Sequence, residues 1–257
     1  MFFSTTFKHY ISLGYFCSVA LELERFGLRD ASYPFDWIIS DIKSVFECIE
    51  NNFESILDIN LLSQSQNEHK NYKNIKYGFY FFHDFNKYIP LSSQLDVVKE
   101  KYNRRIKRFY NAIKEPTLFI RYISDEKKTS DGKSEELAWI ETNINKITNT
   151  IKSFNSENEI IFIANEGVLS DKINIYWVTP DDNDTVARKP FDKNESLYNY
   201  FSNVDYEFKG NNLKHYEEKK LAKNKIHEPI KVKIKNIYKK IFTTEYTHLI
   251  TYNEKGK

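Results

Sequence analysis

The stretch TLFIRYI, residues 117–123, decides the fold of this chain of 257 residues. It is short and almost wholly apolar, which is typical of a strand that is buried on both faces. Two similar runs follow it, EIIFIAN at 159–165 and KINIYWVT at 172–179, and a helix-length segment precedes the first of them. Strands that alternate with helices predict βαβ units in a mixed, mostly parallel sheet with helices on both faces.

The rest of the chain extends this α/β pattern. HYISL at 9–13 predicts a first strand, and the aromatic-rich IKYGFYFFHDF at 75–85 is strand-like. Apolar residues recur at helical spacing over 42–56, 95–113 and 137–154. We therefore expect one α/β domain over residues 1–208.

A lysine-rich helical extension is predicted over 209–257. Eleven lysines but only three glutamates lie between positions 209 and 240, and four isoleucines fall on one helical face: Ile230, Ile234, Ile237 and Ile241. Such a helix either docks its apolar face on the domain or contacts an anionic membrane or acidic polymer. No nucleic-acid recognition module accompanies the lysines, so nucleic acid is not favoured as a partner.

Composition narrows the class of protein. Hydrophobic residues make up 40% and aromatic residues 16%, so the chain should fold, and its net charge of +2 is not that of a polycation. Two cysteines, Cys17 and Cys48, are too few for a disulfide scaffold, and no residue spacing indicates a metal or a cofactor. The N-terminus lacks a secretory signal, and no apolar run has the length of a membrane span. We expect a cytoplasmic protein, with peripheral contact at the inner face of the membrane through the lysine-rich extension.

Cys17 is the first candidate for chemistry. In SLGYFCSVALELERFGLRDASYPFDW, residues 12–37, it follows a strand and a turn at Gly14 and precedes a helix. The positive end of that helix is expected to lower the thiol pKa, and its free N–H groups could hold an oxyanion. The alternative is that Cys17 is a small buried apolar residue, which is the role assigned to Cys48.

His83, in FFHDF, is the candidate general base for the thiol, with the alternative that it is a hydrogen-bonded core residue. His9, before the first strand, is a reserve candidate. A third residue would orient the imidazole, and Asp36 or Asp84 is favoured for this role.

Asp125 and Asn165 are further candidates for the orienting role, because each lies just past the end of a predicted strand. Arg121 lies inside a buried strand and must be paired or face a cleft. It could bind a substrate carboxylate or phosphate, or pair with one of the two favoured aspartates. Gly14 and Trp37 are also expected to contact substrate.

Three blocks carry a resemblance to a known family: SLGYFCSVALELERFGLRDASYPFDW, FFHDF and YNRRIKRFYNAIKEPTLFIRY. Over roughly residues 9–165 the chain resembles DUF1796, a bacterial family described as papain-like cysteine peptidases. The resemblance implies Cys17 as nucleophile and His83 as base, and it implies an α+β papain-like fold as the alternative architecture. Members tend to be encoded among surface-polysaccharide genes, which implies a role connected with glycans.

Three functions are compatible with these observations. The first is a cysteine-dependent hydrolase or acyl transferase acting on an amide or ester of a glycan or small molecule. The second is a glycosyl- or phospho-transferase of capsule or lipopolysaccharide assembly, with a nucleotide-activated donor at the Gly14 turn and Arg121 neutralising charge. The third is a non-enzymatic module that binds a membrane or polymer through the lysine-rich extension. The sequence favours the first.

Overall fold

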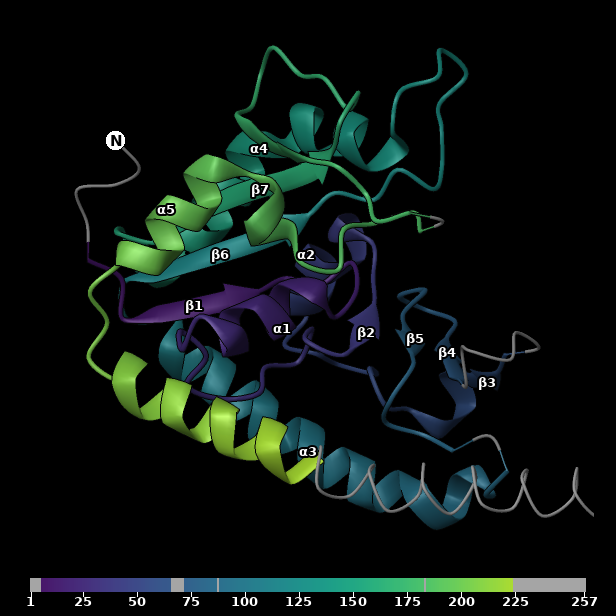
Figure 1. Ribbon diagram of the computed structural model, residues 1–257. Coiled ribbons are helices and arrows are strands. Elements are labelled where there is room, and N and C mark those ends of the chain that lie inside the picture. Colours follow the sequence, from purple (N-terminus) through teal and green to yellow (C-terminus); the bar gives the residue numbers. More distant parts are fainter. Residues whose placement is uncertain (1–5, 66–71, 87, 183, 224–257) are drawn as a thin grey trace, which may run out of the picture. The chain divides into compact units, whose positions relative to one another are not determined.

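The computed structural model describes residues 6–65, 72–86, 88–182 and 184–223 (Figure 1). The chain divides into two units, Met1–Asn212 and Leu213–Lys257, and each is described by itself. Residues 213–223 of the second unit are helical. The predicted isoleucine face at 230–241 lies outside the described residues, so the membrane-binding extension stays a prediction. None of the helices in the described part of the chain is long and apolar enough to span a bilayer.

A four-stranded parallel sheet forms the centre of the first unit (Figure 1). Its strands, in spatial order, are β1 (His9–Ser12), β6 (Thr117–Tyr122), β7 (Glu159–Asn165) and β8 (Ile175–Val178). All three neighbouring pairs are parallel. The runs at 9–13, 117–123, 159–165 and 172–179 each contain a strand of this sheet. The prediction of an α/β protein with a parallel sheet is therefore confirmed.

Helices cover both faces of this sheet because the side chains of each strand alternate between two apolar clusters. One cluster joins strand residues such as Tyr10, Leu118 and Ile163 to one pair of helices, α1 (Ser18–Arg25) and α5 (Glu195–Asn203). The 3-10 turn η2 (Pro190–Lys193) belongs to this layer. The other cluster joins Ile11, Phe119 and other strand residues to three helices, α2 (Ile42–Glu50), α3 (Leu91–Ala112) and α4 (Glu135–Phe154).

A second, antiparallel sheet accompanies the parallel one. Its short strands, in spatial order, are β2 (Ile38–Ile39), β5 (Tyr80–Phe81), β4 (Tyr72–Asn74) and β3 (Leu62–Gln64), and β3 follows the 3-10 turn η1 (Ile59–Leu61). The aromatic run at 75–85 is a strand only at its centre, because Gly78 adopts a left-handed φ of 71° and turns the chain between β4 and β5. The fold is therefore a mixture of a parallel and an antiparallel sheet.

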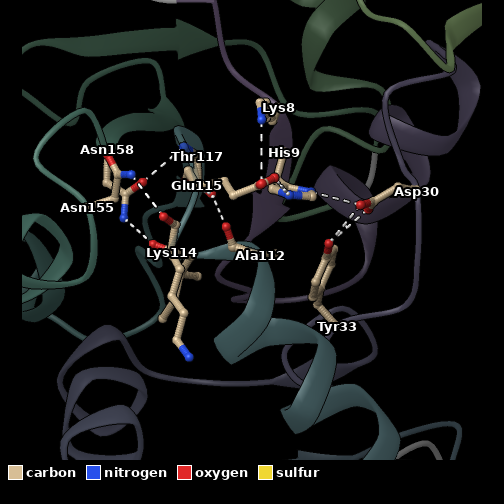
Figure 2. A network of polar contacts seen from close by, with 11 residues as sticks. Lys8, His9, Asp30, Tyr33, Ala112, Lys114, Glu115, Thr117, Asn155 and Asn158 are labelled. Atoms are coloured by element: carbon tan, nitrogen blue, oxygen red, sulfur yellow. Dashed lines mark hydrogen bonds and ion pairs between the residues drawn. The ribbon is translucent and has the colours of Figure 1, made fainter.

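A network of polar contacts lies at the amino end of the parallel sheet (Figure 2). His9 Nδ1 lies 2.9 Å from Asp30 Oδ2, and His9 Nε2 lies 3.2 Å from Glu115 Oε2. The Tyr33 hydroxyl donates to Asp30 at 2.9 Å. Burial lowers the pKa of His9, but hydrogen bonds and charges from the two carboxylates outweigh burial, so the pKa lies above the ordinary value. His9 thus joins the start of β1 to two distant loops.

Candidate functional site

Cys17 lies at the opposite end of β1, immediately before α1. Two successive residues in the left-handed region, Gly14 (φ 82°) and Tyr15 (φ 56°), reverse the chain between the strand and the helix. A side chain at Gly14 would place its Cβ 2.5 Å from Ser40 Oγ and 3.2 Å from Phe35 O. Protein atoms therefore occupy the position where a side chain would stand, and close packing accounts for glycine here. We leave Gly14 out of the proposed substrate site.

The thiol of Cys17 is half-buried and makes no capping hydrogen bond to α1. Burial raises the pKa of Cys17, although its own backbone N–H acts in the opposite direction. The expected lowering of this pKa is therefore not observed, because desolvation by burial dominates. At neutral pH the group is a thiol in the free protein. Cys48 is fully buried in the core, as predicted.

His83 lies two residues past β5, in the bend that follows this strand of the antiparallel sheet, and its side chain is exposed to solvent. The indole of Trp37 meets the imidazole edge-on, with ring centroids 5.8 Å apart. Although this side chain reaches solvent, the protein atoms around the imidazole desolvate it in part and lower the pKa of His83, while the neighbouring Asp84 acts in the opposite direction. The imidazole is thus neutral at neutral pH. Within the described ranges, no hydrogen bond joins it to Cys17 or to a carboxylate.

The backbone connects the segment that carries Cys17 to the segments that carry Trp37 and His83. Ser40 N–H donates to Tyr15 O at 3.0 Å, which attaches the turn before Cys17 to the end of β2. Trp37 immediately precedes β2, and β2 pairs with β5 in the register Ile38↔Phe81. The Cys17 turn is therefore attached to β2, which pairs with the strand that precedes His83, and Trp37 contacts His83 directly.

Both carboxylates favoured for orienting the imidazole have other partners. Asp36 is buried and accepts hydrogen bonds from Arg29 Nη2 at 2.8 Å and Tyr33 N at 2.9 Å. Asp84 contacts α3, where its partners are Lys101 at 2.9 Å, Tyr102 at 3.1 Å and Arg105 at 3.3 Å. Neither carboxylate hydrogen-bonds to His83.

The two other candidates for the orienting role lie at the carboxyl end of the parallel sheet. Asp125 pairs with Lys128. Asn165 accepts a hydrogen bond from the Tyr122 hydroxyl and donates to Thr185 O. His9 is also removed from Cys17, because the two residues lie at opposite ends of β1. None of the residues that the sequence suggested for the orienting role hydrogen-bonds to His83 in the described part of the chain.

Arg121 is fully buried and its five N–H donors all have acceptors in the protein. Two donate to the Glu136 carboxylate at 2.7 and 2.9 Å, one to Leu13 O at 2.8 Å, and two to the hydroxyl and carbonyl of Ser40. The predicted pairing with Asp36 or Asp84 is wrong, because its partner is Glu136 in the first turn of α4. Arg121 thus joins β6, α4 and the Cys17 turn, and we leave it out of the proposed substrate site.

Two hollows adjoin Tyr15 at the carboxyl end of the parallel sheet. The smaller has a volume of about 110 Å³ and the larger about 230 Å³. The smaller one is lined by four carboxylate side chains and one lysine, which are Asp41, Glu126, Glu135, Glu136 and Lys127. This lining repels a phosphate, so the geometry does not favour a nucleotide-activated donor here. The described residues hold no group of three or more His, Cys, Asp or Glu side chains arranged for a metal ion.

Comparison with known proteins identifies the family. Residues 8–166 match the family model described as "Putative papain-like cysteine peptidase (DUF1796)". The chain belongs to the DUF1796 family. Its description suggests a cysteine hydrolase.

This DUF1796 protein is similar to a viral protein. The "Uncharacterized protein R408" of Acanthamoeba polyphaga mimivirus is 33% identical over an alignment of 151 residues, and this alignment covers 50% of this chain and 67% of the relative. No solved structure matches the chain. These findings give no support to a bacterial source, to a link with surface polysaccharides or to acyl transfer, and they do not establish a papain-like fold.

Proposed function

We propose that this DUF1796 protein is a cysteine hydrolase in which Cys17 attacks the carbonyl carbon of an amide or ester and His83 is the general base. The observation that carries the proposal is the position of Cys17, half-buried between a strand, a left-handed turn and the start of α1. Family membership supports the same chemistry. The chain connections are compatible with it, because Ser40 after β2 hydrogen-bonds to the Cys17 turn and β2 pairs with β5, the strand before His83.

The protonation states favour a thiol–imidazole pair over a preformed ion pair. Burial raises the pKa of the Cys17 thiol and partial desolvation lowers the pKa of His83, so the thiol and the neutral imidazole are the main forms at neutral pH. In the proposed first step the Cys17 S–H proton moves to His83 as the sulfur bonds to the carbonyl carbon. The imidazolium then gives this proton to the leaving amine or alcohol, which leaves a thioester on Cys17.

Water resolves the thioester in the second step. His83 takes a proton from water as the oxygen attacks the thioester, and the proton returns to sulfur as the acid leaves. The first turn of α1 supplies donors for the oxyanion in both steps, because the first intrahelical bond is that from Leu21 N–H to Cys17 O. A second substrate in place of water would make the same site an acyl transferase.

Replacement of Cys17 by alanine tests this function directly. The probe is p-nitrophenyl acetate, an activated ester, and intact-mass spectrometry follows the acetylated protein. We expect the wild-type protein to acquire one acetyl group on Cys17 and to release it slowly, and we expect Cys17→Ala to form no thioester. The matched control is Cys48→Ala, which removes the other, fully buried thiol. Equal p-nitrophenol release by Cys17→Ala and the wild-type protein would overturn the proposal.

A further inference from the structure

The motifs Gly-Leu-Arg and Pro-Phe-Asp-Trp, at 27–29 and 34–37, contain charged and aromatic residues that the hydrolytic steps do not use. In the structure Arg29, Asp36 and Trp37 form a contiguous set with His83. We propose that Trp37 is the positioning residue for His83, and that the Arg29–Asp36 ion pair holds Trp37 in place. The effect of Trp37 on catalysis rests on the proposed function, whereas the contact between the two rings does not.

The contact between the two rings is the first step of the argument. The Trp37 indole lies edge-on to the imidazole, with an angle of 87° between the ring planes. Such edge-to-face contacts prefer a defined geometry, so they restrict the rotation of both rings. Among the described residues two rings contact the imidazole, that of its sequence neighbour Phe82 with centroids 4.7 Å apart and that of Trp37, and Trp37 is the one that comes from another segment. Trp37 therefore couples His83 to the loop before β2.

The second step is the support of Trp37 by Arg29. The guanidinium carbon of Arg29 lies 4.9 Å from the centre of the Trp37 ring, which is a cation–π distance. Its Nη2 donates to Asp36 at 2.8 Å and to Ser32 Oγ at 2.7 Å. Arg29 Nε is buried without a hydrogen-bond partner among the described residues. The guanidinium thus keeps its place over the indole although one of its donors is unsatisfied.

The third step is the anchoring of Arg29 by Asp36. The side chain of Asp36 is 2% exposed and that of Arg29 is 10% exposed, so solvent screens the pair little. Asp36 also accepts from Tyr33 N–H, which fixes its carboxylate in the loop before β2. Since Asp36 and Trp37 are adjacent in sequence, the pair holds both the backbone and the indole of this segment. Asp36 therefore acts on His83 through Arg29 and Trp37.

Nuclear magnetic resonance of the full chain tests the proposal without any substrate. In the wild-type protein we expect nuclear Overhauser effects between the Trp37 indole and the His83 ring protons. We expect Trp37→Ala to move the pKa of His83 upward, toward the ordinary histidine value of about 6.5, because the indole no longer shields the imidazole. The matched control is Trp177→Ala on β8, which should leave the His83 titration unchanged.

Arg29→Lys separates the charge of Arg29 from its planar shape. Lysine can still pair with Asp36 but cannot cover the indole in the same way, so we expect weaker Trp37–His83 nuclear Overhauser effects. Acetylation of Cys17 by p-nitrophenyl acetate should slow about tenfold in Trp37→Ala. If Trp37→Ala fails to fold, the nuclear Overhauser effects in the wild-type protein decide alone. Their absence, or an unchanged His83 titration in folded Trp37→Ala, would overturn the proposal.

The outcomes of this experiment and of the test of the function are distinct. A hydrolytic role for Cys17 fails if Cys17→Ala stays fully active, and this result leaves the ring contact untouched. The positioning role of Trp37 is tested by the nuclear Overhauser effects and the titration of His83, and these do not depend on the activity of Cys17.

Discussion

Two histidines of this protein have opposite surroundings. His9 lies between two carboxylates at the amino end of the parallel sheet, and its pKa is raised (Figure 2). His83 lies beside aromatic rings on the antiparallel sheet, and its pKa is lowered. The comparison shows that the neighbours of an imidazole decide its task. The two carboxylates favour the protonated form of His9, which joins two loops to β1, whereas the neutral form that a general base requires is favoured at His83.

The largest expected effect is that of His83→Gln on catalysis. Glutamine retains polarity but cannot accept the thiol proton, so acetylation of Cys17 by p-nitrophenyl acetate should slow by about 10²–10⁴-fold at pH 7. Because the His83 side chain is exposed, the melting temperature should stay nearly unchanged. Stopped-flow absorbance of p-nitrophenol measures the rate.

His9→Gln is the matched control for this variant. It should retain the wild-type acetylation rate, because His9 is at the far end of β1 from Cys17. A large loss of rate in His9→Gln, with none in His83→Gln, would reverse the assignment of the two histidines.

The next expected effect is that of His9→Gln on stability. The variant loses hydrogen bonds to two carboxylates, and both of these partly face solvent. We therefore expect a loss of about 1–2 kcal/mol in the free energy of unfolding near pH 6. Urea unfolding followed by circular dichroism measures this change. An equal loss in His83→Gln would contradict the structural distinction between the two residues.

The smallest expected effect is the pH dependence of the difference in unfolding free energy between the wild-type protein and His9→Gln. The pKa of His9 is raised in the folded protein, so the stability gained from its charge is fully present below the unfolded pKa of about 6.5. This contribution is lost as pH rises through the folded pKa, because neutral His9 has one N–H donor for two carboxylates.

Urea unfolding at several pH values tests this dependence. The stability difference between the wild-type protein and His9→Gln should shrink when pH is raised from about 6 to about 9. A difference that grows over this range would show that Asp30 and Glu115 do not hold a protonated His9.

Much of the fold could be predicted from local sequence pattern. The runs at 117–123 and 159–165 are β6 and β7, and the apolar stripe over 137–154 is α4. The place of Cys17 between strand, turn and helix was also predicted. The antiparallel sheet was not predicted, because its strands have only two or three residues and too few alternations for a period to appear.

The sequence by itself determined the strand–helix alternation, the place of Cys17 and the need for Arg121 to be paired. These follow from residue spacing and from the cost of burying a charge, and both can be evaluated locally. Only the tertiary structure decided that Arg121 pairs with Glu136, that burial raises the pKa of Cys17, and which surroundings each histidine has. The physical reason is distance along the chain: His9 meets Glu115 across 106 positions, and burial depends on all the segments that fold around a group.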